Sequence, residues 1–186
     1  MGATVMQIDK MLFGRNWKKF LFWGIALVIL GMLAISAATF TTLASVVFIG
    51  ILIFIAGAII AIDAATFWKG NTSGFVLHLL MGILYLVVGI ELIKDPLNGS
   101  ISLTLLLGIF YLVLGIFRTV YALMHRVPKW QWNLLNALIS LALGLLILAN
   151  WPASSLYIIG LFVGIDLLFS GWVYIMGALA GRSMLK

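Results

Sequence analysis

The stretch from residue 42 to residue 62 reads TLASVVFIGILIFIAGAIIAI and contains no charged side chain. An α-helix needs about 20 apolar residues to cross the roughly 30 Å hydrocarbon layer of a membrane. The stretch shows no alternation of polar and apolar residues, which a strand of a membrane β-barrel would require. It therefore predicts a transmembrane helix.

Five other stretches have the same character. The six predicted spans are Trp17–Ala38, Thr42–Ile62, Phe75–Ile93, Ile101–Leu123, Trp130–Ala149 and Ser155–Leu179. Composition agrees, because 65% of the residues are hydrophobic, 9% are charged and the mean hydropathy is +1.25. So few charges cannot cover the surface of a soluble domain of this size. The predicted fold class is an all-α membrane protein with six transmembrane helices.

Short breaks separate the helices within three pairs. They fall at Thr39–Thr42, Lys94–Gly99 and Asn150–Pro152, and each joins two helices by a few residues. We therefore expect three tight antiparallel hairpins. The expected organisation is an N-terminal arm, a membrane domain made of three repeats, and a short tail, over residues 1–16, 17–180 (repeats about 17–68, 75–126 and 130–180) and 181–186.

Basic residues predict the orientation, because cytoplasmic segments carry an excess of Lys and Arg. Those in the arm, the second and fourth connections and the tail are Lys10, Arg15, Lys18, Lys19, Lys69, Arg126, Lys129, Arg182 and Lys186. The three opposite connections hold only Lys94. This asymmetry places both termini in the cytoplasm. The apolar run after Lys19 also resembles a cleavable signal peptide, but it is long for one, and the repeat described next needs this helix.

Glycines recur in register along the chain. In the odd-numbered spans, Gly31, Gly89 and Gly144 lie 58 and 55 residues apart. In the even-numbered spans, Gly50, Gly108 and Gly164 lie 58 and 56 residues apart, and each is followed seven residues later by Gly57, Gly115 and Gly171. This registration indicates an internal repeat of about 56 residues. Because two crossings return the chain to the same side, the repeats are parallel, unlike the inverted repeats of many transporters.

The glycines predict where helices pack. Residues seven apart lie on nearly the same face of a helix. Between apolar helices in lipid, small residues allow the backbones to approach and gain van der Waals contact. We therefore interpret the glycine faces as packing seams. A substrate path along these thin faces is the alternative.

Two glycine-bounded stretches make the chain resemble a known family. The sequences GIFYLVLG at 108–115 and GIDLLFSG at 164–171, within three hairpins of this length, are similar to the HdeD family of acid-resistance membrane proteins. The resemblance implies six helices, a location in the bacterial inner membrane and a role in surviving acid stress. It supplies no catalytic residue.

Asp166 is the principal candidate for a polar site inside the membrane. It lies about twelve residues into the last predicted span, where a charge is costly. It is two residues past Gly164, hence roughly 200° around the helix from the glycine face. We expect it, together with Ser170 one turn later, to face a cavity, another helix or a second copy of the chain. A protonated Asp166 that links helices is the favoured role, proton-linked function is one alternative, and an ion pair with Arg118 or His78 is another.

Arg118 and His78 have simpler interpretations. Arg118 lies within two turns of the predicted cytoplasmic end of its span, so its side chain can extend to the head groups. His78 begins the third span near the same side, and a histidine titrates in the range that an acid sensor needs. An incidental histidine at the membrane surface is the competing interpretation.

Enzyme signatures are absent from the sequence. It contains no zinc-protease, nucleophile-elbow or phosphate-loop motif, and without cysteine it offers no thiolate chemistry. We expect no catalytic, cofactor or metal site, no nucleic-acid partner, and membrane lipid as the surroundings, with self-association left open. Three functions fit: a non-catalytic acid-stress protein, a small channel or transporter that uses Asp166, or a scaffold for a partner complex.

Overall fold

The computed structural model describes residues 2–67, 72–124 and 130–183, with side chains described for 17–64, 66, 74–124 and 130–181. Across these residues the chain forms six α-helices and one 3₁₀-helix. They are α1 (Gly2–Ser36), α2 (Ala38–Phe67), α3 (Thr72–Lys94), α4 (Pro96–Met124), α5 (Trp130–Ala149), η1 (Ala153–Leu156) and α6 (Ile158–Ser183). Each α-helix is long and apolar enough to cross a membrane. The predicted fold class, all-α with six transmembrane helices, is confirmed.

Several residues used for the orientation lie outside the described parts of the chain. Lys69, Arg126, Lys129 and Lys186 are not described, and nor are the side chains of Lys10, Arg15 and Arg182. The segment expected as an arm, residues 1–16, belongs to the first turns of α1 from Gly2 onward.

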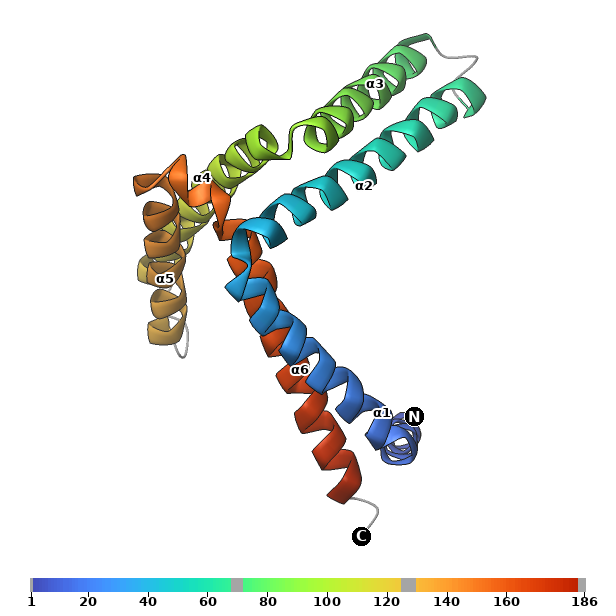
Figure 1. Ribbon diagram of the computed structural model, residues 1–186, viewed down its shortest axis with the longest axis vertical. Coiled ribbons are helices and arrows are strands. Elements are labelled where there is room, and N and C mark those ends of the chain that lie inside the picture. The colour runs from blue at the N-terminus through green and yellow to red at the C-terminus, as the bar shows by residue number, and fades with distance from the viewer. Residues whose placement is uncertain (1, 68–71, 125–129, 184–186) are drawn as a thin grey trace. The chain divides into compact units, whose positions relative to one another are not determined.

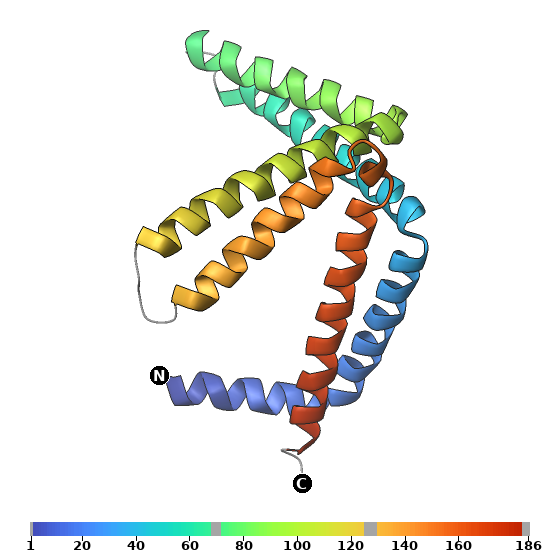
Figure 2. The ribbon, with the colours of Figure 1, turned by 90° about the vertical axis from the view of Figure 1, so that its left-hand side faces the viewer.

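The chain divides into two compact units. One unit contains residues 1–41 and 160–186, so it consists of α1 with α6. The other contains residues 42–159, with α2 to α5 and η1. Within the units the helices lie side by side in three pairs, α1 with α6, α2 with α3, and α4 with α5 (Figures 1 and 2).

Glycines hold the α2–α3 and α4–α5 pairs at backbone contact. A Cβ atom on Gly57 would lie 2.7 Å from the backbone nitrogen of Leu86, and one on Gly89 would lie 2.7 Å from that of Phe54. In the next pair, a Cβ on Gly115 would lie 2.6 Å from the nitrogen of Leu141. Such distances are shorter than carbon atoms tolerate, so only glycine allows the two helices this approach.

Glycines also bring the backbones of α1 and α6 into contact. A Cβ on Gly31 would lie 2.8 Å from the carbonyl oxygen of Gly164, and one on Gly171 would lie 2.7 Å from that of Gly24. The partners therefore follow a cyclic order in the sequence: each even helix packs against the odd helix of the next repeat, and α6 packs against α1. In every pair, glycines of the 56-residue repeat lie at the contact.

This pairing differs from the tight hairpins expected across the short breaks. Between α3 and α4 the break is one residue, Asp95, which takes part in the hydrogen bonding of both helices. The N–H of Asp95 donates to the oxygen of Glu91 at 2.9 Å, and that of Gly99 donates to the oxygen of Asp95 at 3.0 Å. Pro96 has no N–H, and the N–H of Asn98 donates instead to the side chain of Asp95, so the helical ladder is interrupted and the chain changes direction here. Helices α3 and α4 diverge from the break between them (Figure 2).

The first break is built in the same way. The N–H of Ala37 donates to the oxygen of Leu33 at 3.0 Å, and that of Thr41 donates to the oxygen of Ala37 at 2.9 Å. The hydroxyl of Thr41 also donates to the oxygen of Ala34 at 3.1 Å, which satisfies a carbonyl at the break. At the third break, the hydroxyl of Ser154 makes the corresponding bond, seven residues back, to Ile147 at 2.9 Å.

The breaks of the larger unit meet in a small core. Val46 of α2, Leu92 of α3 and Ile159 of α6 form its buried centre, and partly buried side chains of α2 and α4 pack around them. Three hydroxyl residues, eight or nine residues before the first even-helix glycine of each repeat, are fully buried: Thr42, Ser100 and Ser155. Ser100 donates to the oxygen of Leu97 at 2.7 Å. Small, internally satisfied side chains let the helix ends converge here.

We predict that Gly144→Ala destabilises the protein although alanine favours helix formation by about 1 kcal/mol. The new methyl group would lie 2.5 Å from the backbone nitrogen of Leu112, so α4 and α5 must separate. Overpacking of this kind costs about 1–3 kcal/mol. The free energy of unfolding, measured by detergent denaturation, should fall by that amount.

Ala142→Val is the matched control, because Ala142 is exposed on the same helix. Its effect should stay within about 0.5 kcal/mol, as for other surface substitutions. A Gly144→Ala protein as stable as the wild type would contradict the glycine seam.

Candidate functional site

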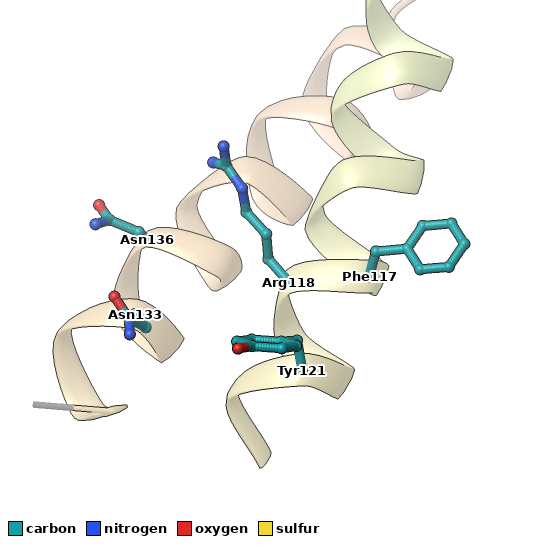
Figure 3. A pocket seen from close by; sticks show the side chains of 5 residues that line it. All are labelled: Phe117, Arg118, Tyr121, Asn133 and Asn136. Carbon is teal, nitrogen blue, oxygen red and sulfur yellow. The ribbon is translucent and has the colours of Figure 1, made fainter. Parts of the chain in front are cut away.

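A polar groove lies between α4 and α5, beyond the end of their glycine seam. It has a volume of about 610 Å³ and is lined by Phe117, Arg118 and Tyr121 of α4 and by Asn133 and Asn136 of α5. Arg118 and Tyr121 are three residues apart, as are Asn133 and Asn136, so the members of each pair share one face of their helix. Arg118 and Tyr121 point from α4 toward the side of α5 that carries the two asparagines, whereas Phe117 points away (Figure 3). We call this site the Arg118 groove.

Arg118 carries an uncompensated charge in this groove. Its side chain is exposed, and the described residues that line the groove include no carboxylate. Among the residues whose side chains are described, the guanidinium makes no hydrogen bond or ion pair. The carboxamide groups of Asn133 and Asn136 each add two N–H donors to the guanidinium's five. The groove therefore gathers donors and positive charge, which suits a bound anion.

The same place in the α2–α3 pair carries different side chains. Counting from the seam glycines, Asn133 lies 11 residues before Gly144 and His78 lies 11 residues before Gly89. Asp63 likewise corresponds to Tyr121. The Nδ1 atom of His78 lies 3.1 Å from the carbonyl oxygen of Gly74, within hydrogen-bonding distance.

In the α1–α6 pair the corresponding residues are aromatic. Phe20 matches Asn133 and Tyr174 matches Arg118. Their ring centroids are 6.0 Å apart, so these two positions face each other across the pair. The three pairs thus share a glycine seam but differ in chemistry at this end.

Asp166 and Ser170 lie on α6, in the unit formed with α1. Asp166 is exposed and Ser170 is half-buried, whereas Gly164 and Gly171 are buried against α1. Asp166 makes no hydrogen bond or ion pair to any residue that the structure describes. Arg118 and His78 belong to the other unit. The roles assigned to Asp166, Arg118, His78 and Ser170 from the sequence stay predictions.

A second polar groove lies where α3 meets α4. It has a volume of about 340 Å³, and its polar lining residues are Glu91, Asp95, Asn98 and Ser102. Asp95 is the N-cap of α4 and is followed by Pro96, which suits the first helical position. The backbone N–H of Asn98 donates to Asp95 Oδ1 at 3.1 Å, and its Nδ2 donates to Oδ2 at 2.6 Å. The backbone bond, and then the carboxamide bond, lower the pKa of Asp95 below its ordinary 3.8.

Most residues of the Arg118 groove were not predicted from the sequence. Arg118 was a candidate, but Tyr121, Asn133 and Asn136 were not, because the sequence pattern was interpreted one helix at a time. A usable signal was present: two asparagines three residues apart stand at the start of an otherwise apolar span. What was lacking was the knowledge that α4 packs against α5.

Comparison with known families gives one match. The profile of the family described as a short repeat of unknown function (DUF308) matches residues 22–94 and 92–149. The second segment contains α4, α5 and the Arg118 groove. The 164–171 stretch and Asp166 lie outside both segments. No curated protein and no solved structure shows significant similarity to the chain.

We predict that Asp95 makes stability depend on pH in acid. Because its folded-state pKa is lowered, the cap stabilises fully above the ordinary pKa of 3.8 and is lost as the pH falls through the lowered value. The melting temperature of the wild type should therefore drop as the pH falls below 3.8 and through the lowered pKa.

Asp95→Asn should keep the cap, since asparagine caps helices as well as aspartate does, but should flatten this part of the pH profile. Glu91→Gln is the control, because Glu91 lines the same groove but its carboxylate makes no hydrogen bond to any described residue. An Asp95→Asn profile identical to that of the wild type would show that the carboxylate is not responsible.

Proposed function

Because the chain belongs to the DUF308 short-repeat family, which includes HdeD, we propose that it is a non-catalytic protein of the bacterial inner membrane that contributes to acid resistance. The family match is the observation that carries this proposal. It covers more than half of the chain and includes the α2–α3 and α4–α5 pairs.

The membrane location has independent physical support. The exposed surface of the helices consists largely of Leu, Ile, Val, Phe and Met side chains, which only a lipid environment accommodates over such an area. The proposed orientation, with both termini in the cytoplasm, rests on the distribution of Lys and Arg in the sequence. The proposed role is non-catalytic because the sequence contains none of the catalytic motifs sought above.

A strain that lacks the gene should survive an acid challenge less well than its parent, and the wild-type gene should restore survival. Gly144→Ala in the complementing gene should restore it only in part, since it weakens the α4–α5 pair. Counts of viable cells after the challenge measure this. Equal survival of the deletion strain and its parent would reject the acid-resistance role.

Asp166 favours a second property, self-association. It lies eight residues after Ile158, so it is about 12 Å into α6, on a side that α1 does not cover. A carboxyl that faces lipid at such a depth costs about 2.5–3.5 kcal/mol on insertion scales. A second copy of the chain would remove it from lipid and supply a hydrogen-bond partner.

We expect the protein in nanodiscs to have a mass of more than one 20.4 kDa chain. Asp166→Leu should reduce the assembly to single chains, because leucine has no polar group to satisfy. Asp166→Asn should remain assembled, because an amide keeps the hydrogen bond. A wild-type protein of one chain per nanodisc would refute self-association, and proton flux into proteoliposomes that requires Asp166 would favour a transporter instead.

A further inference from the structure

We propose that the Arg118 groove binds the phosphate of an anionic phospholipid. The guanidinium of Arg118 would make paired hydrogen bonds to the phosphate oxygens, and the carboxamides of Asn133 and Asn136 would donate from α5. The lipid's acyl chains would lie along the apolar surface of α4. Neither the acid-resistance role nor the role of Asp166 includes such a site.

The side chains that line the Arg118 groove favour an anion as the ligand. Arg118 has no ion-pair partner among the residues whose side chains are described, and none of those that line the groove is a carboxylate. A guanidinium matches the geometry of phosphate with two parallel N–H bonds and is weakly hydrated compared with an ammonium group. The asparagine carboxamides add further donors on the facing helix. A cation or a neutral apolar solute would leave this set of donors unsatisfied.

The position of the groove along its helices favours a lipid over a dissolved anion as the ligand. Arg118 lies inside the candidate span Pro96–Met124, six residues before its end and therefore about 9 Å from it. Tryptophans tend to mark the head-group level, and α5 begins with Trp130 and Trp132. The groove thus lies near one end of both spans, from which the long side chain of Arg118 can reach the phosphate level.

The surroundings of the groove also suit a lipid. Phe117, which borders the groove, is 71% exposed and offers an apolar surface to an acyl chain. Basic pockets between transmembrane helices are known to hold anionic head groups.

Comparison with the other pairs indicates that packing alone does not require Arg118. The residue in its place is Ile60 in α2 and Tyr174 in α6, and those pairs form the same glycine seam. A polar substitution at Arg118 should therefore fold, and its effects on lipid binding can be separated from effects on stability.

The test is native mass spectrometry of the full-length protein titrated with phosphatidylglycerol or with zwitterionic phosphatidylcholine. The wild type should bind phosphatidylglycerol more tightly. Arg118→Gln should weaken that binding about tenfold, the lower end of what a charge-assisted hydrogen-bonded contact contributes. Arg118→Lys should weaken it less, because the charge remains but the paired geometry is lost.

Two further variants locate the site. Asn133→Ala with Asn136→Ala should also weaken phosphatidylglycerol binding. Lys94→Gln removes one positive charge from the opposite end of a span and should leave the affinity unchanged. The melting temperature of each variant, measured in parallel, confirms that it is folded.

Three outcomes would overturn the proposal. Equal affinity for the two lipids would show that the groove does not select charge. Equal losses in Lys94→Gln and Arg118→Gln would show that net charge, and not this groove, attracts the lipid. Displacement of phosphatidylglycerol by an excess of inorganic phosphate would show that the groove is a site for a dissolved anion.

Discussion

Backbone contact through glycine is the interaction on which the rest of this structure depends. Lipid surrounds the helices on every side, so apolar side chains gain little by meeting each other, and close packing must supply the attraction. Gly57 and Gly89 bring α2 and α3 together, Gly115 and Gly144 bring α4 and α5 together, and the α1–α6 pair repeats the arrangement. A single methyl group at these positions would meet backbone atoms, which do not yield as a flexible side chain would.

In each repeat, the glycines that pack the helices and the side chains that differ between pairs occupy separate positions. The seam is the same in all three pairs, but the positions beyond it hold Arg118 and Asn133 in one pair, His78 and Asp63 in another, and the stacked rings of Phe20 and Tyr174 in the third. Because packing does not depend on these positions, each pair can present different chemistry at the membrane surface. The Arg118 groove is the clearest case, since its charge has no partner among the described residues.

Sequence patterns predicted the six helices and the faces that carry the glycines, because both follow from local periodicity and from the length needed to cross lipid. They did not predict which helices pack. A short break such as the one at Asp95 was interpreted as a tight turn that packs its two helices together, but α3 packs against α2 and α4 packs against α5. The glycine register identifies a face of α4, and only the three-dimensional structure shows that this face meets α5. Tyr121, Asn133 and Asn136 were missed for the same reason, since a groove between two helices has no signature in either one.

Cross-linking tests the pairing most directly, because the chain contains no cysteine of its own. A Cβ on Gly82 would lie 3.1 Å from that of Ala61, close to the separation of about 3.5–4.5 Å in a disulfide. A Gly82→Cys/Ala61→Cys protein should therefore form an intramolecular disulfide between α3 and α2 in native membranes. Gly82→Cys/Gly108→Cys, which a tight hairpin of α3 and α4 would join at equal distances from Asp95, should not. Formation of the second disulfide without the first would contradict the pairing.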